Sequence, residues 1–157
     1  MKFSILISSY NKGKYIEKCI TSCLKQKEKD YEIIVFDNYS TDNTLKILKR
    51  FGKKIRIYKK KRLSNYPALN QIDLIKNAFQ KSRGKYICLL DADDYFKINK
   101  LSKLKKYFVK KKVNTIFDLP IKKYSHFNKK FKDKRKFQKN IWPSIIPTSS
   151  ISCKRSF

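Results

Sequence analysis

Three of the 12 acidic residues in the chain fall within four positions, at Asp91, Asp93 and Asp94. They directly follow residues 85–90, an apolar run with the composition of a buried strand. Carboxylates placed this closely repel one another unless a cation lies between them. A hard divalent ion such as Mg²⁺ or Mn²⁺ would relieve that repulsion and leave coordination positions for substrate phosphates. The alternative interpretation is a solvated acidic turn that caps the next helix.

The acidic turn belongs to a regular alternation of apolar strands and amphipathic helices. We expect strands at 3–8, 31–36, 55–58, 85–90 and 115–119, and helices at 14–26, 45–50, 71–82 and 99–111. Such an alternation predicts an α/β fold, with a mainly parallel sheet and helices on both faces. Ligands of open parallel sheets bind at the carboxyl ends of the strands, where the acidic turn lies.

The alternation ends near Pro120. Residues 122–140 are mostly Lys, Arg, Phe and Asn without a clear period, and the last residues suggest at most one more strand. We therefore expect an α/β domain over 1–119, followed by a basic, aromatic segment over 120–157.

The charge of the chain is strongly one-sided, with 40 Lys and Arg against 12 Asp and Glu. A formal net charge of +28 favours phosphate-bearing ligands, anionic membrane surfaces and nucleic acids. A compositional bias toward lysine is the simpler explanation for most of these residues. A compact carboxylate cluster repels nucleic-acid phosphates, so no nucleic-acid partner is expected.

The four cysteines lack the spacing of a zinc site and favour a reducing, cytoplasmic setting.

Three segments together resemble the family 2 glycosyltransferases of the GT-A fold. The chain opens with SILISSYNKGKYIEKCITSCLKQ, continues with YEIIVFDNYSTDNT, and then carries RGKYICLLDADDYFKINKL. The first is similar to the family's opening strand and Ser-Tyr-Asn turn. The second is similar to its Asp-(Asp/Asn)-x-Ser-Thr-Asp loop, and the third to its Leu-Asp-x-Asp-Asp segment. The order and the spacing agree over residues 1 to about 119.

The resemblance implies a site that binds a nucleotide-sugar donor. The residues that would contact the nucleotide are Ser8, Tyr10, Asp37, Asn38 and Asp91. The Tyr10 ring would pack against the base, and Asp93 with Asp91 would bind Mn²⁺ or Mg²⁺ on the diphosphate. From the residues alone, Tyr10 is equally compatible with a plain surface aromatic, and Asp37 with a carboxylate that caps a turn.

The implied activity is glycosyl transfer with inversion to a saccharide or lipid-linked acceptor, from a nucleotide-sugar donor for which uridine is the family's commonest base. Cell-surface polysaccharide synthesis in the cytoplasm, at the inner face of the membrane, would suit it. No residue matches the family's general base, and Asp118 and Asp133 are the acids available near the end of the chain. The chain thus resembles a family member truncated before the acceptor-binding region. The alternative is a nucleotide-sugar-binding protein with little or no transferase activity.

Overall fold

The computed structural model describes residues 3–117 and 151–156. Their strands form one sheet and comprise β1 (Phe3–Ser9), β2 (Tyr31–Asp37), β3 (Arg56–Lys59), β4 (Tyr86–Asp91), β5 (Thr115–Phe117) and β6 (Ile151–Lys154). The helices are α1 (Ile16–Leu24), α2 (Thr44–Lys49), α3 (Pro67–Lys81) and α4 (Lys100–Lys110), with a short 3-10 turn η1 (Gly52–Lys54).

The sheet has the strand order β3-β2-β1-β4-β6-β5. The pairs β1–β2, β1–β4 and β2–β3 are parallel, while β6 runs antiparallel to both β4 and β5. From β1 the chain first builds outward through β2 and β3, and then returns to place β4 on the other side of β1. The order of the strands therefore reverses between β1 and β4, which is the point where open α/β sheets bind ligands.

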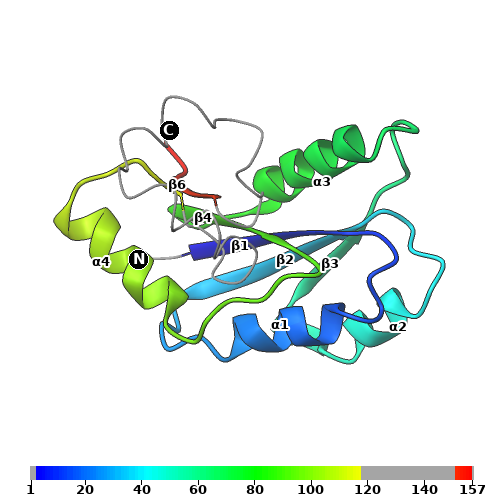
Figure 1. Cartoon of the computed structure of the whole chain (residues 1–157), viewed down its shortest axis with the longest axis horizontal. Coiled ribbons are helices and arrows are strands. Elements are labelled where there is room, and N and C mark those ends of the chain that lie inside the picture. The colour runs from blue at the N-terminus through cyan, green and yellow to red at the C-terminus, as the bar shows by residue number, and fades with distance from the viewer. Residues whose placement is uncertain (1–2, 118–150, 157) are drawn as a thin grey trace, which may run out of the picture.

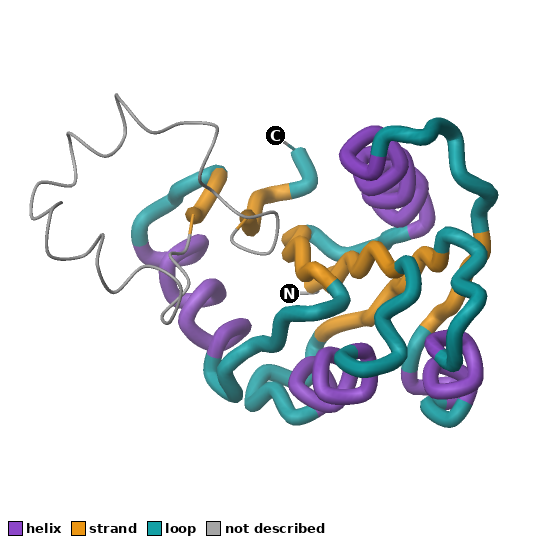
Figure 2. The backbone as a smooth tube through the Cα atoms, turned by 45° about the vertical axis from the view of Figure 1, so that its right-hand side comes forward, coloured by secondary structure: helices purple, strands orange, loops and turns teal. Residues whose placement is uncertain are grey.

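Helices cover both faces of this sheet, as Figures 1 and 2 show. Helices α1, α2 and α4 pack on one face, where buried side chains such as Ile20, Leu48 and Leu104 meet Ile5 and other alternate strand residues. Helix α3 packs on the other face, where Leu74 and Ala78 meet the intervening strand residues. This alternation follows from the two-residue period of a strand. The expected mainly parallel sheet with helices on both faces is confirmed.

One boundary differs from the sequence-based expectations. The helix expected at 71–82 begins earlier, at Pro67. Proline suits the first turn of a helix, because its fixed φ matches the helix and its missing N–H needs no partner there. The fifth predicted strand, β5, lies at the edge of the sheet beside β6. The proposed boundary at 119/120 stays a prediction, since residues 118–150 lie outside the described part.

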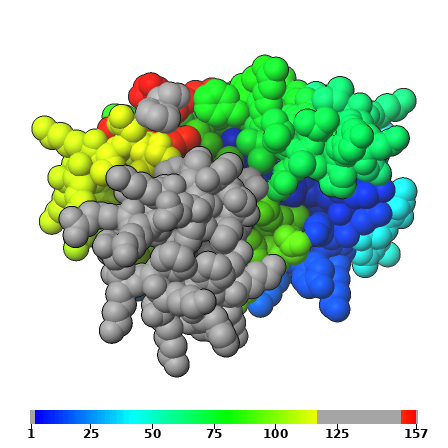
Figure 3. Space-filling view, turned by 45° about the horizontal axis from the view of Figure 1, so that its top comes forward, coloured from blue at the N-terminus to red at the C-terminus, as the bar shows by residue number. Residues whose placement is uncertain are grey.

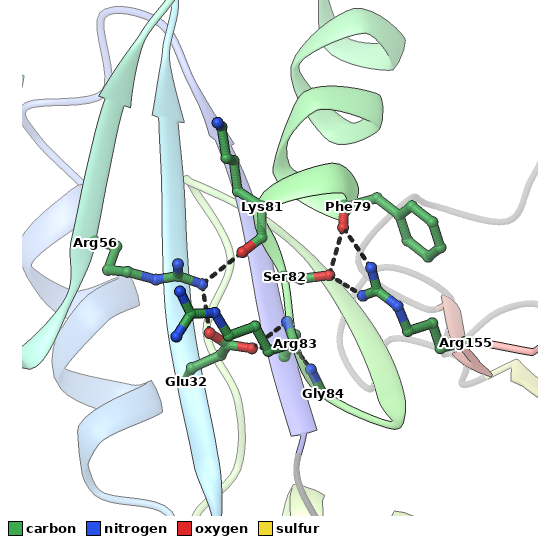
Figure 4. A network of polar contacts seen from close by, with 9 residues as sticks. Glu32, Arg56, Phe79, Lys81, Ser82, Arg83, Gly84 and Arg155 are labelled. Carbon is green, nitrogen blue, oxygen red and sulfur yellow. Dashed lines mark hydrogen bonds and ion pairs between the residues drawn. The ribbon is translucent and has the colours of Figure 1, made fainter.

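Strand β6 is joined to the end of helix α3 through Arg155 (Figure 4). The guanidinium donates to Ser82 Oγ at 2.6 Å and to the carbonyl oxygen of Phe79 at 3.2 Å, and it lies 4.6 Å from the centre of the Phe79 ring. The Arg155 backbone N–H also donates to the carbonyl oxygen of Lys85. Arg155 thereby adds hydrogen bonds at the helix end, where the carbonyl oxygen of Phe79 also accepts from the backbone N–H and the hydroxyl of Ser82.

Candidate functional site

The carboxyl ends of β1, β2 and β4 meet at one edge of the sheet. In the strand register Ser8 is opposite Asp91, and Ser9 is opposite Asp37. The residues that follow these strands must therefore lie along the same edge. Ser8 and Asp91 continue the strand positions that face α3, since Leu6 and Ile87 of the same strands contact that helix.

The loop after β1 is fastened to the loop after β2 by hydrogen bonds. The backbone N–H of Asn11 donates to Ser40 Oγ, that of Lys12 to Thr44 Oγ1, and that of Gly13 to Asp42 Oδ2. The two segments approach so closely that a Cβ atom at residue 13 would lie 1.7 Å from a side-chain oxygen of residue 43. Glycine is therefore needed at this position for the loops to meet.

Asp37 and Asn38 are both buried, and their side chains hold backbone in place. The Asp37 carboxylate accepts hydrogen bonds from the backbone N–H and the hydroxyl of Ser40, at 2.7 and 2.6 Å. Asn38 donates from its side-chain amide to the carbonyl oxygen of Lys60 at 2.8 Å. The turn-capping alternative thus describes what Asp37 does in this structure. That Asp37 and Asn38 contact a nucleotide stays a prediction.

Asp91 and Asp93 each have a polar partner from another element. Gln71 on α3 donates from Nε2 to Asp91 Oδ1 at 2.7 Å. Lys12 Nζ lies 2.6 Å from Asp93 Oδ2, and both of these side chains are partly exposed. The backbone N–H of Asp94 donates to the carbonyl oxygen of Asp91, which forms a tight turn directly after β4. The sequence alone pointed to neither Gln71 nor Lys12, because each contact spans many residues.

The donor chemistry of this turn fits a hard divalent cation. Carboxylate oxygens from Asp91 and Asp93 are the ligands that Mg²⁺ and Mn²⁺ prefer, and Mg²⁺ is commonly held by one or two carboxylates together with substrate phosphates. Among residues 3–117 and 151–156, no group of three or more His, Cys, Asp or Glu side chains is arranged to hold a metal. These residues would thus hold an ion only in part, and a bound diphosphate would have to complete its coordination.

Tyr10 presents a partly exposed ring at the same edge. The guanidinium carbon of Arg62 lies 5.1 Å from the centre of that ring, within the range of a cation–π contact. Arg62 belongs to the basic segment 59–62 that follows β3. An exposed aromatic ring beside fixed positive charge suits a planar base joined to phosphates.

Two titratable groups beside the site have shifted pKa values. Desolvation alone would raise the pKa of Asp42, but the hydrogen bonds that Asp42 accepts from Thr44 and Gly13 outweigh it and lower the pKa. Cys19 lies beneath the acidic turn, with Sγ 3.7 Å from the carbonyl oxygen of Asp91. Its pKa is raised well above the ordinary value, by the hydrogen bond with Cys23 first and by burial second. Cys19 is therefore a neutral packing residue.

An open groove of about 450 Å³ lies between α1 and the segment that follows the acidic turn. Its lining includes Lys18, Ser22 and Tyr95, and none of the predicted site residues belongs to it. The groove therefore adds nothing to the candidate site. The two acids considered as a general base, Asp118 and Asp133, lie outside the described residues.

The reversal of strand order at β1 and β4, with a carboxylate turn at that edge, is the arrangement at which open, doubly wound α/β proteins bind their ligands. Comparison with known protein families identifies the type more closely, because residues 4–155 match "Glycosyl transferase family 2". This chain belongs to glycosyl transferase family 2, and its fold is the GT-A fold.

Curated relatives match part of the chain. Poly(ribitol-phosphate) beta-N-acetylglucosaminyltransferase TarS of Staphylococcus aureus is 31% identical over 102 residues, which are 64% of this chain and 17% of TarS. Poly(ribitol-phosphate) beta-glucosyltransferase of Bacillus spizizenii is 38% identical over 100 residues, which are 60% of this chain and 15% of that protein. The chain thus spans less than a fifth of the length of these two relatives.

Solved structures show the same fold. The crystal structure of S. aureus TarS superposes with a TM-score of 0.65 at 26% identity, over 74% of this chain and 21% of that one. S. aureus TarS 1–349 in complex with UDP-GlcNAc gives 0.64 at 24%, over 77% and 37%. The mannosyltransferase PcManGT of Pyrobaculum calidifontis, in complex with GDP-Man and Mn²⁺, gives 0.63 at 17%, over 76% and 35%.

Proposed function

We propose that this chain binds a nucleotide-diphosphate sugar at the carboxyl edge of β1, β2 and β4, and supplies the donor site of a glycosyltransferase. The observation that carries the proposal is the strand register, which places Ser8 opposite Asp91 and Ser9 opposite Asp37 at the reversal of strand order. The family membership supports glycosyl transfer as the reaction.

The nucleotide would lie along this edge with its base at the Tyr10 ring and its diphosphate at the acidic turn. Ser8 offers a hydroxyl, and Asp91, oriented by Gln71, offers a carboxylate to the ribose. Asp37 and Asn38 keep the loop after β2 in position. A uridine nucleotide is the preferred candidate, because TarS has been solved with UDP-GlcNAc and with UDP.

A divalent cation held by Asp93 and Asp91 would neutralise the charge that gathers on the nucleoside diphosphate as it leaves. Mn²⁺ or Mg²⁺ suits these oxygens, and the related mannosyltransferase was solved with Mn²⁺. Lys12 and Arg62 lie at the same edge and would add positive charge near the phosphates. Positive charge beside the leaving diphosphate favours its departure.

The acceptor would be a saccharide or a lipid-linked saccharide, and the sugar would be transferred by direct displacement with inversion. Names of relatives such as the poly(ribitol-phosphate) transferases favour the synthesis of a cell-surface polymer, at the cytoplasmic face of the membrane. In this proposal residues 1–119 bind the donor and residues 120–157 begin the acceptor region. In this proposal no residue is given the role of the general base.

The test is a calorimetric titration of the chain with UDP, GDP and ADP, each with and without Mn²⁺. We expect one nucleotide, most simply UDP, to bind with roughly micromolar to millimolar affinity, and Mn²⁺ to tighten the binding. Asp93→Asn should remove the effect of Mn²⁺. Asp94→Asn is the matched control in the same turn and should retain it.

Equal Mn²⁺ dependence in the wild type and in Asp93→Asn would overturn the assignment of the cation to Asp93. A product assay with the radiolabelled sugar nucleotide then separates the two functions that the sequence left open. Transfer to an acceptor supports a glycosyltransferase, whereas nucleotide binding without transfer supports a nucleotide-sugar-binding protein.

A further inference from the structure

The outer face of helix α3 exposes a stripe of large apolar side chains. Leu69, Ile72 and Phe79 recur at helical spacing, and Leu63 and Tyr66 extend the stripe into the preceding loop. Helix α3 lies within the green part of the surface in Figure 3. Their exposed fractions are 68% for Leu63, 71% for Tyr66, 48% for Leu69, 62% for Ile72 and 38% for Phe79. Isolated exposed apolar residues are normal, but a contiguous set marks a surface that contacts something apolar.

The loop end of the stripe is held in a defined conformation. Asn70 is buried beneath it, and its side-chain oxygen accepts hydrogen bonds from the backbone N–H groups of Leu63 and Ser64. Its side-chain nitrogen donates to the carbonyl oxygens of Ser64 and Tyr66. A buried amide with both of its polar atoms engaged fixes the loop that presents Leu63 and Tyr66 to solvent.

The surroundings of the stripe are basic. Arg62, Lys76, Lys81 and Arg83 are exposed along the same helix and its ends. Asp73 is the one acidic residue of α3, and its carboxylate forms an ion pair with Lys60 at 2.7 Å. The face thus combines an apolar stripe with unopposed positive charge, which is the pattern of helices that lie on anionic lipid surfaces.

We infer that the α3 stripe (Leu63, Tyr66, Leu69, Ile72 and Phe79) is a peripheral docking surface for an anionic lipid bilayer. The acyl region would accept the apolar side chains, and the lipid phosphates would attract the flanking lysines and arginines. A second copy of the chain suits the face poorly, because each copy carries a formal net charge of +28. Within residues 3–117 and 151–156 no helix is long and apolar enough to cross a membrane, so the contact lies on the surface.

This orientation has a consequence for the proposed donor site. Helix α3 also carries Gln71, which donates to Asp91. A bilayer against α3 would therefore bring the carboxyl edge of the sheet close to the lipid surface, where a lipid-linked acceptor is held. Only this consequence rests on the proposed function, because the docking surface depends on α3 and the loop before it alone.

The test is flotation of the whole chain with vesicles of phosphatidylcholine, with and without an equal amount of phosphatidylglycerol. We expect binding to the anionic vesicles. The double variant Leu69→Gln/Ile72→Gln should weaken that binding about tenfold or more, because two apolar side chains no longer enter the acyl region. The variant leaves the net charge unchanged, so a purely electrostatic attraction would persist in it.

The matched control is Ile98→Gln/Val109→Gln, because both residues are 53% exposed and neither lies on α3. The control should bind vesicles as the wild type does, and both variants should keep the wild-type Tm and UDP affinity. Three results would overturn the inference: no vesicle binding by the wild type, equal binding by the two double variants, or a dimer in light scattering that only the α3 variant breaks. Absence of UDP binding by the wild type would instead count against the proposed function.

Discussion

Lys12 engages the carboxylate that the proposed cation requires. Its Nζ lies 2.6 Å from Asp93 Oδ2, and the two side chains are 34% and 45% exposed. An ion bound through Oδ2 of Asp93 would compete with this ammonium group for the same oxygen. Ion pairs with this degree of exposure contribute up to about 1 kcal/mol, so displacement would weaken metal binding without preventing it. Once displaced, the ammonium would lie free to interact with a diphosphate.

We therefore predict that Lys12→Met binds Mn²⁺ roughly two- to fivefold more tightly than the wild type, in line with the loss of one exposed ion pair. Methionine keeps much of the length of the side chain and removes the charge. The measurement is a titration followed by Mn²⁺ electron paramagnetic resonance. Lys14→Met is the control, because it makes the same charge change two residues away. Equal affinity in the two variants would contradict a direct competition at Asp93.

At the level of single residues, the sequence alone predicted the site carboxylates but not the side chains that contact them. Asp91 and Asp93 follow a strand-like run, and that run predicts their place at the sheet edge. Lys12 and Gln71 reach these carboxylates across 81 and 20 residues. Nothing local to a lysine in a chain with 40 basic residues distinguishes the one that makes the contact.

Among the elements, helix α4 is tied to the segment after α1 by the ion pair of Glu28 and Lys105. The atoms are 2.6 Å apart, and the Glu28 side chain is 13% exposed. The hydrogen bond from Lys105 is the main cause that holds the pKa of Glu28 below its ordinary value. A carboxyl with a lowered folded-state pKa stabilises the fold above its unfolded-state pKa. That stabilisation is lost as the pH falls through the folded-state value.

We accordingly predict that Glu28→Gln lowers Tm at about pH 7, and that the difference from the wild type is smaller at about pH 3, because it declines below the unfolded-state pKa near 4.3 and is lost fully only below the lowered folded-state pKa. Thermal melts followed by circular dichroism at the two pH values provide the measurement. Glu17→Gln removes the more exposed pair with Arg50 and should change Tm little at either pH. A Glu28→Gln difference that is the same at both pH values would contradict the assigned cause.

The connection of β6 to α3 gives another prediction. Arg155 donates to Ser82 and Phe79 at the end of the helix. Hydrogen bonds from a partly exposed charged group of this kind are worth about 1–2 kcal/mol. Arg155→Met should then lower Tm by roughly 3–6 °C. Lys154→Met is the control, since Lys154 donates to Asn114 at the surface. Equal Tm values for the two variants would show that Arg155 does not fasten β6.

Hydrophobic periodicity located most elements but not their neighbours in the sheet. Residues 3–8, 31–36 and 85–90 were expected as strands and form β1, β2 and β4 with one residue's difference at their ends. The place of β6 between β4 and β5 depends on pairing between residues that are distant in the sequence, such as Cys88 with Ser152 and Phe117 with Ile151. The start of α3 was expected at residue 71 rather than at Pro67, because proline is common in turns as well as in the first turn of a helix.

For the molecule as a whole, the net charge of +28 attracts phosphates, whereas the carboxylate turn repels them. The general positive field attracts phosphates to every part of the surface. The carboxylates of Asp91 and Asp93 make the edge after β4 locally negative, so a diphosphate would bind there only with a cation. This difference separates a specific donor site from unspecific attraction, and it decides which measurement is most informative.

That measurement is a nuclear magnetic resonance titration of the isotope-labelled chain with UDP and Mn²⁺, because the paramagnetic ion broadens the signals of the amides nearest to it. We predict that the amide signals of residues 91–94 and of Lys12 broaden first, and that those at the opposite ends of the same strands, such as Phe3, Tyr31 and Tyr86, broaden least. Broadening centred on that opposite end, or spread evenly over the basic surface, would contradict the assignment of the donor site to the carboxyl edge of β1, β2 and β4.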